Sequence, residues 1–219
     1  EDNSKYFSKL IPTWLKPILS VGLIASMILA ALPAPMVSAQ LVPLGKAASF
    51  DCNTVSDVPT FECEALVALY DSTDGGAWFE NENWFTSTTV GTWYGVTVTG
   101  NHVTHIDLTN NYLIGTIPEE LGDLSELVAL KMSNNQLSGS IPSQLGVLSN
   151  LAIFKLEFNQ LSGPLPPELE NLSMIRELSF AFNELSGGIP AWLGNLTTLE
   201  NLALGGNPLG GEIPSELGN

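Results

Sequence analysis

The chain has 219 residues, of which 44% are hydrophobic and 14% charged, so it has enough apolar material for a folded domain and is not a disordered chain. Lys and Arg total 7 against 23 Asp and Glu, which gives a formal net charge of −16. Phosphate binding needs a basic surface, so this balance argues against nucleic acid as a partner.

The first 39 residues have the three parts of a secretory signal peptide. Three lysines precede an apolar run over 18–32, and prolines and the small residues at 37–39 follow it. We predict that 1–39 is a signal peptide, cleaved after Ala39. A retained membrane anchor is the alternative, but the run is shorter than the roughly 20 residues that a spanning helix needs. We therefore expect a secreted or cell-surface protein.

The sequence contains two cysteines, Cys52 and Cys63. A reactive thiol pair or a metal site is one interpretation, but a metal site needs more ligands and no histidine is nearby. In an oxidising compartment a structural disulfide is the better prediction. It would close a short loop and stabilise the fold by about 2–3 kcal/mol in the chain-entropy model.

One motif recurs every 24 residues over 103–219. Self-similarity of this length is typical of stacked repeat architectures. Each unit has an asparagine, a leucine two places later, a glycine four places later and a proline seven places later. The asparagines are Asn111, Asn135, Asn159, Asn183 and Asn207. We assign 103–219 to five units, of which the last is incomplete.

The parts of one unit predict its conformation. The alternation Leu130-Lys131-Met132-Ser133 predicts a short strand with one buried face. The asparagine amide suits the turn that follows, because it can bond to backbone groups that a turn leaves unpaired. The glycine permits a positive φ and the proline an extended segment. Stacked units bury the faces that one unit cannot, which predicts an α/β repeat fold: a curved solenoid with a parallel sheet on its concave face.

The units resemble the plant-specific class of leucine-rich repeats, as in Leu-Ser-Gly-Ser-Ile-Pro-Ser-Gln-Leu-Gly at 137–146. This class occurs in ectodomains of receptor-like kinases and in polygalacturonase-inhibitor-type proteins. The segment before the units is similar to the amino-terminal cap of that family, and the resemblance implies a cap region over 40–102. Its markers lie at 64–70, 76–78, 83–84 and 93–96.

Helix formers with apolar spacing at 62–70 predict a helix in this cap, and we expect it to cover the first strand and protect an open sheet edge. The chain departs from the family at one place. Family caps have a cysteine pair flanking the Trp-Tyr-Gly-Val segment, whereas this chain has Gly91 and Val98 there. The cap is therefore expected to depend on tryptophan packing and on the Cys52–Cys63 bridge.

The candidate ligand site is on the concave face, where the side chains that flank the strand leucines point outward. Beyond the signal peptide the chain has four basic residues, and three of them are on this face beside an aromatic pair on adjacent units. Aromatic and arginine side chains dominate binding energies, which favours a recognition patch. The predicted ligand-binding residues are Lys131, Lys155, Glu157, Phe158, Arg176 and Phe182.

The competing interpretation is a surface whose side chains satisfy one another. Exposed ion pairs contribute about 0–1 kcal/mol and need no ligand, and aromatic pairs on sheets also simply pack together. The expected pairs are Asp107 with Lys131, Glu157 with Lys155, and Glu200 with Arg176.

Chemistry-bearing motifs are weak. His105 and Asp107 share a strand face, but no serine or cysteine is placed to act with them, so we do not expect an enzyme. The polar segment 71–75 has some features of a calcium loop but lacks the later glutamate, and we interpret it as a cap loop. No cofactor or metal motif is present in the sequence.

The leading hypothesis is an extracellular binding module for a protein, a peptide or a glycan. The alternative is a structural or adhesive cell-surface solenoid without a specific ligand. Membrane attachment is expected only through a segment that is not part of this chain. Fold alone does not identify the ligand.

Overall fold

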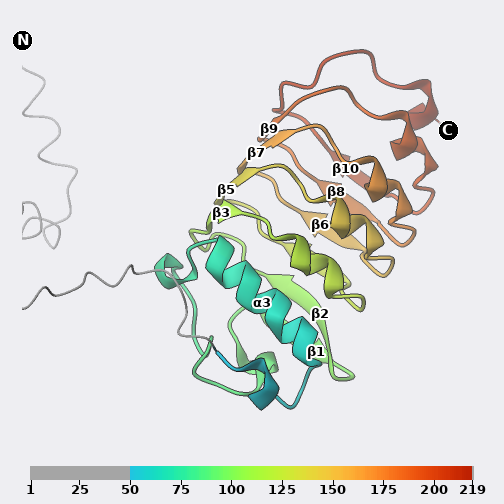
Figure 1. Cartoon of the computed structure of the whole chain (residues 1–219). Coiled ribbons are helices and arrows are strands. Elements are labelled where there is room, and N and C mark those ends of the chain that lie inside the picture. Colours follow the sequence, from blue (N-terminus) through green and yellow to red (C-terminus); the bar gives the residue numbers. More distant parts are fainter. Residues whose placement is uncertain (1–49, 219) are drawn as a thin grey trace, which may run out of the picture. The chain divides into compact units, whose positions relative to one another are not determined.

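The computed structural model describes residues 50–218, which form two stacks of short strands and a row of helices (Figure 1). The predicted signal peptide lies outside the described residues. The first sheet contains, in spatial order, β1 (Val96–Thr99), β2 (His102–Asp107), β4 (Ala129–Lys131), β6 (Ile153–Lys155), β8 (Glu177–Ser179) and β10 (Asn201–Ala203). The second contains β3 (Ile114–Thr116), β5 (Gln136–Gly139), β7 (Gln160–Gly163) and β9 (Glu184–Leu185).

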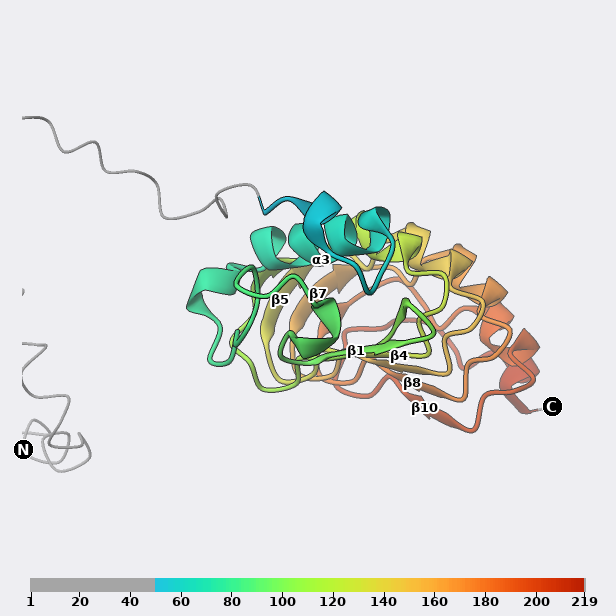
Figure 2. The ribbon, with the colours of Figure 1, turned by 90° about the horizontal axis from the view of Figure 1, so that it is seen from below.

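The 3₁₀ helices of the repeat units lie opposite the first sheet (Figure 2). The one α-helix among the described residues is α3 (Thr60–Ser72). The 3₁₀ helices are η1 (Cys52–Thr54), η2 (Gly75–Ala77), η3 (Val90–Thr92), η4 (Glu119–Asp123), η5 (Ser143–Val147), η6 (Pro167–Asn171), η7 (Ala191–Asn195) and η8 (Ser215–Gly218).

Equivalent strands of successive units pair in parallel and in register. Lys131 lies opposite Lys155, and Lys155 lies opposite Ser179. This confirms the predicted α/β leucine-rich-repeat solenoid with its parallel sheet. The second sheet was not predicted, because three of its four strands contain glycine and all four are only two to four residues long. The glycines Gly139 and Gly163 have φ of 76° and 82°, as the turn interpretation required.

The core is a column of apolar side chains between the sheets and the helices. Each full unit contributes apolar side chains from the strand, from the turn and from the 3₁₀ helix, and Leu130, Leu137 and Leu145 are completely buried. Burying one such side chain contributes about 1.5–3 kcal/mol relative to exposure. Because each unit's apolar face is completed by its neighbour, stability accumulates along the stack.

The asparagine side chains form a partly buried ladder that joins the units. The Oδ1 of Asn159 accepts the backbone N–H of Leu137 in the preceding unit at 2.9 Å. Its Nδ2 donates to the carbonyl of Met132 in that unit and to the carbonyl of Leu156 in its own unit, both at 3.0 Å. Asn183 and Asn207 form equivalent bonds. The asparagine amide thus supplies hydrogen-bond partners for backbone N–H and C=O groups that the turn at the strand end would otherwise leave unpaired.

The region before the repeats was predicted to be a cap whose helix covers the first strand. Helix α3 lies on the helical side of the solenoid, where it contacts η4 and β3, and its Glu62 carboxylate reaches the start of β2 (Figures 1 and 2). The edge of the first sheet is covered instead by β1, which pairs antiparallel with β2. A strand can satisfy the unpaired N–H and C=O groups of an edge, whereas a helix has no free backbone groups along its side.

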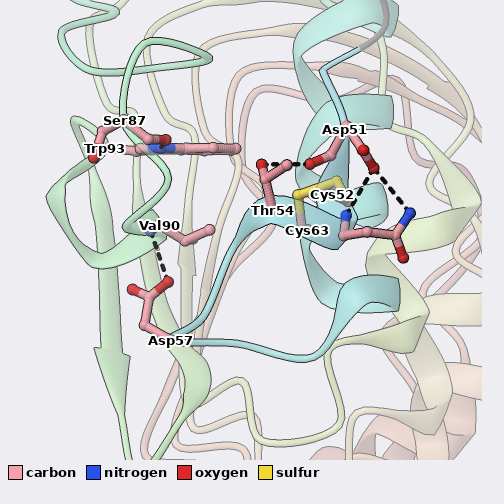
Figure 3. The surroundings of a disulfide bond; sticks show 9 residues. Asp51, Cys52, Thr54, Asp57, Cys63, Ser87, Val90 and Trp93 are labelled. Atoms are coloured by element: carbon pink, nitrogen blue, oxygen red, sulfur yellow. Dashed lines mark hydrogen bonds between the residues drawn. A yellow bond between two sulfur atoms is a disulfide. The ribbon is translucent and has the colours of Figure 1, made fainter.

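The predicted disulfide between Cys52 and Cys63 is present and joins η1 to α3 (Figure 3). Downstream of it, the Asp57 carboxylate accepts the backbone N–H groups of Val90 and Gly91 at 2.9 and 2.8 Å. Segment 50–57 is thus fixed to α3 by a covalent bond and to η3 by two hydrogen bonds. The disulfide closes a short loop, so it stabilises the fold by only about 2–3 kcal/mol in the chain-entropy model.

The two positions where the family has cysteines face one another. A Cβ atom built on Gly91 would lie 3.3 Å from the Cβ of Val98. No bridge joins these two positions, and the predicted cap region is held by a cluster of aromatic rings. Trp84 contacts Trp78 and Trp93 at centroid distances of 5.0 and 4.9 Å, and all three indoles are buried. Their N–H groups donate to backbone carbonyls, so the cluster buries no unsatisfied donor.

A buried glutamate connects α3 to the start of β2. Glu62 is completely buried, and its carboxylate accepts His102 Nδ1–H at 2.6 Å and the backbone N–H of Val103 at 2.7 Å. The hydrogen bond to Glu62 raises the pKa of His102. A carboxylate removed from water needs such partners, and a protonated imidazole also neutralises its charge.

We predict that Asn159→Ala lowers the free energy of unfolding by about 2–4 kcal/mol, because it leaves buried backbone groups of two units without partners. Chemical denaturation monitored by circular dichroism measures this value. The control is Gln160→Ala, which changes the exposed neighbouring residue and is expected to have little effect. Equal losses in the two variants would contradict the proposed importance of the ladder.

We predict that stability falls as the pH rises through the pKa of His102. A group whose folded pKa is raised stabilises the fold fully below its unfolded pKa, about 6.5, and this contribution is lost above the folded pKa. The thermal midpoint is measured from about pH 6 to pH 9. His102→Gln retains a neutral donor for Glu62 and should remove this part of the pH dependence. A wild-type midpoint that stays flat over this range, or matches that of the variant, would contradict the prediction.

Candidate functional site

The first sheet presents an outer surface that we call the strand face. On it, every basic side chain of the described residues pairs with a carboxylate on a neighbouring strand or unit. The Nζ–O distances are 3.4 Å for Lys131–Asp107 and 2.6 Å for Lys155–Glu177, and Arg176 Nη1 lies 3.6 Å from Glu200. All six side chains are partly exposed, so each pair contributes about 0–1 kcal/mol.

The expected partner of Lys155 was wrong. We expected Glu157, two places along the same strand, but Lys155 bonds to Glu177 on β8. Neighbouring strands are about 4.8 Å apart, whereas residues two places apart along a strand are separated by about 6.7 Å. Cross-strand pairing is therefore the shorter contact, and it leaves Glu157 without a cation.

Glu157 is the unusual polar group of this surface. Neither of its carboxylate oxygens has a hydrogen-bond partner among residues 50–218, and Oε2 is buried. Equivalent places on neighbouring units have Ser133, which is itself buried, and Ala181. A buried acceptor without a partner costs about 1–3 kcal/mol, and more when it is charged.

The aromatic pair lies beside Glu157. The rings of Phe158 and Phe182 are stacked, with centroids 4.5 Å apart and planes 9° apart. The side chains are 48% and 55% exposed. The ring of Phe182 extends over Gly206, where an added Cβ would lie 2.6 Å from the phenylalanine Cδ1. Three adjacent units thus contribute to one exposed apolar ridge.

Both phenylalanines have a left-handed backbone, with φ of 58° and 54°. The other units use residues that adopt this conformation readily: Asn110, Asn134 and Gly206. A bulky residue at positive φ is a backbone outlier that costs on the order of 1 kcal/mol or more. The chain therefore has two exposed aromatic residues at places where the fold itself favours asparagine or glycine.

A shallow hollow of about 340 Å³ lies on the same face and is lined by residues of β6, β8 and β10. The polar or charged residues in its lining are Lys155, Glu177, Ser179 and Asn201.

A second exposed aromatic pair was missed from the sequence. Phe79 and Tyr112 have ring centroids 5.1 Å apart and are 70% and 41% exposed. Tyr112 follows a repeat asparagine and was open to prediction, since it also departs from the polar residues at that place. Phe79 lies in the cap loop, where no repeat gives its position.

His105 and Asp107 each have a partner other than the other residue. The Nδ1 of His105 lies 3.0 Å from the hydroxyl of its neighbour Thr104, and Asp107 bonds to Lys131. Within residues 50–218 no group of three or more histidine, cysteine, aspartate or glutamate side chains is arranged to hold a metal ion. In the same part of the chain, no helix has the length and apolarity needed to span a bilayer.

Comparison with known proteins identifies the family. The Leucine Rich Repeat model matches five segments, 102–124, 126–148, 150–172, 174–196 and 198–219, which together make up more than half of the chain. The chain belongs to the leucine-rich repeat family. No match was found among curated proteins.

Solved structures agree with this assignment. One chain in the crystal structure of the BIR3–SERK2 complex from Arabidopsis thaliana is 34% identical to this protein. The match covers 70% of this chain and 85% of that chain, with a TM-score of 0.61. The leucine-rich-repeat ectodomain of the receptor kinase SOBIR1 from the same plant is 29% identical, with 74% and 87% covered and a TM-score of 0.57. A plant ice-binding protein is 29% identical and has a TM-score of 0.69; the match covers 75% of this chain and 54% of that one. The predicted resemblance to plant leucine-rich-repeat proteins is confirmed.

We predict that Phe158→Asn with Phe182→Asn does not destabilise the leucine-rich-repeat domain and raises its thermal midpoint. Asparagine relieves two strained backbone positions and restores the residue type of the preceding units. Differential scanning calorimetry measures the change. The control is Phe154→Asn with Phe180→Asn, which places amides in the core at two completely buried rings and should unfold the domain. A loss of stability in the surface variant would show that the pair is structural.

Proposed function

We propose that this leucine-rich-repeat domain binds an extracellular protein or peptide on its strand face, at a site built around Phe158, Phe182 and Glu157. The carrying observation is the exposed phenylalanine stack, which adopts an unfavourable backbone where the repeat uses asparagine or glycine. Backbone strain and exposed apolar area both oppose folding, so a role in recognition accounts for their presence. Central aromatic residues are the usual anchors of protein interfaces.

The ion pairs reduce the number of predicted site residues that are free to anchor a ligand. Lys131, Lys155 and Arg176 already have carboxylate partners on the sheet, so a ligand must compete for them. We propose that these three basic side chains lie around the site and are not the main contributors to the affinity for the ligand. The unpaired Glu157 and the two phenylalanines remain as the groups that gain most from a ligand.

A protein or peptide fits this surface better than a glycan. Sugar rings bind by lying flat on aromatic faces, but the inner faces of the stacked phenylalanines cover one another and Phe182 extends over Gly206, so the outer face of Phe158 is the one large face that the pair leaves open. The solved BIR3–SERK2 structure is a complex, which supports protein binding by this fold. The disulfide is consistent with an extracellular or cell-surface location, with export through the predicted signal peptide 1–39.

The test is selection of binders by displaying random peptides and small folded domains, with the immobilised protein as target. We expect saturable binders whose affinity falls at least about tenfold in the Phe158→Asn, Phe182→Asn variant, since it removes the anchor. The control is Val147→Asn, which removes an exposed apolar side chain from η5 on the helical side.

Two outcomes count against the proposal. Binders that retain full affinity for the double variant would place recognition elsewhere on the solenoid. A selection that yields no saturable binder would favour the structural or adhesive role without a specific ligand.

A further inference from the structure

The strand face has one charge that no side chain among residues 50–218 balances. The three basic side chains of the described residues are each engaged by a carboxylate on a neighbouring strand or unit. Glu157 is on the same face and has no ion pair or side-chain hydrogen bond within residues 50–218. The sheet therefore has three neutral pairs and one uncompensated carboxylate.

No neighbouring side chain on the described sheet donates to Glu157. The equivalent places on the next two units are Ala181 and Gly205, whose side chains have no donor. On the preceding unit it is Ser133, which forms no hydrogen bond to the carboxylate. Asn134 and Asn159 reach only the backbone carbonyl of Glu157. Within residues 50–218 no side chain donates to this carboxylate, so a bound ligand is able to supply the donor.

The surroundings of Glu157 define what that donor is attached to. The exposed ring of Phe158 is the next residue, and its outer face points toward the preceding unit because its inner face stacks on Phe182. A guanidinium or ammonium group placed over an aromatic ring gains a cation–π interaction, and this gain rises when the group is shielded from water. An apolar side chain of the same ligand is able to pack against the edge of the Phe158–Phe182 ridge.

We propose that the strand face binds a peptide segment in which a basic side chain pairs with Glu157 and an apolar side chain, two places along the extended peptide, rests on the Phe158–Phe182 stack. Alternate side chains of an extended peptide share one face, at a separation of about 6.7 Å. The inference rests on the proposed function and specifies its ligand. The net charge of −16 attracts a basic segment over long range and repels an acidic one.

The test uses three fluorescein-labelled heptapeptides. The first has arginine and phenylalanine two positions apart in a glycine-serine background, and the other two have glutamine or glutamate in place of the arginine. Fluorescence anisotropy measures their binding to the wild type and to Glu157→Gln, Glu157→Lys and Glu184→Gln. Glu184 is exposed on β9 of the other sheet, so its variant makes the same change in net charge away from the site.

We expect the arginine peptide to bind the wild type about tenfold more tightly than the glutamine peptide, and the glutamate peptide to bind most weakly. Glu157→Gln should abolish the preference, Glu157→Lys should invert it in favour of glutamate, and Glu184→Gln should retain it. Glu157→Gln keeps the size of the side chain, so its result remains informative if the lysine variant folds poorly.

Three results would overturn the inference: equal affinities for the three peptides, an arginine preference that persists in Glu157→Gln, or no binding of any peptide up to about 5 mM. The persistent preference would mean that overall charge, and not this carboxylate, attracts the peptide. Failure here is distinct from failure of the proposed function. Display-selected binders that need the two phenylalanines but not Glu157 would leave protein or peptide binding intact and remove only the charge requirement.

Discussion

The side-chain amide of one asparagine per unit fixes the geometry on which the rest of the solenoid depends. A strand that ends every 24 residues leaves backbone N–H and C=O groups in the interior, where water does not reach them. The amide is short enough to stay inside the turn and has both a donor and an acceptor, so it bonds to two units at once. An aspartate at that place would lack the donor and a leucine would lack both groups.

The ladder also determines what the surface can do. Because it keeps successive strands in register, side chains at the same place in neighbouring units are about 4.8 Å apart. That spacing is close to the 4.5 Å between the rings of Phe158 and Phe182. It also explains why Lys155 pairs across strands with Glu177 and leaves Glu157 alone. The site is therefore a consequence of the repeat spacing combined with a few substitutions within it.

The 24-residue repeat made most of the fold predictable, whereas the region before the repeats was difficult to predict. A 24-residue period reports parallel strands, turns and core positions directly, since the same physical requirement recurs in each unit. The cap has no such repetition. Its helix was predicted from composition, but the antiparallel strand β1 and the contact of α3 with η4 depend on how an edge is covered in three dimensions. The disulfide was predictable because two cysteines permit only one intramolecular pairing.

The sequence predicted contacts of the candidate site correctly where the repeat places equivalent residues on neighbouring strands. It failed where one side chain had two possible partners. The adjacency of the phenylalanines followed from their 24-residue separation. The pairing of Lys155 did not, because Glu157 and Glu177 are both near it in the sequence pattern and only the relative lengths of the two contacts decide between them. The left-handed backbone of the phenylalanines was also open to inference, since asparagine and glycine at the equivalent places indicate a positive φ.

The same rigidity that makes this surface regular favours binding. Residues held by a hydrogen-bonded sheet and a packed core lose little freedom when a ligand arrives, so less of the interaction energy is lost to ordering. The strained backbone of the two phenylalanines is tolerated for the same reason, since the ladder on either side holds their turns in place. A flexible loop with the same side chains would relax the strain and collapse the ridge. On this solenoid the repeat provides the scaffold, and the specificity of the proposed site comes from the few exposed positions where the sequence departs from it.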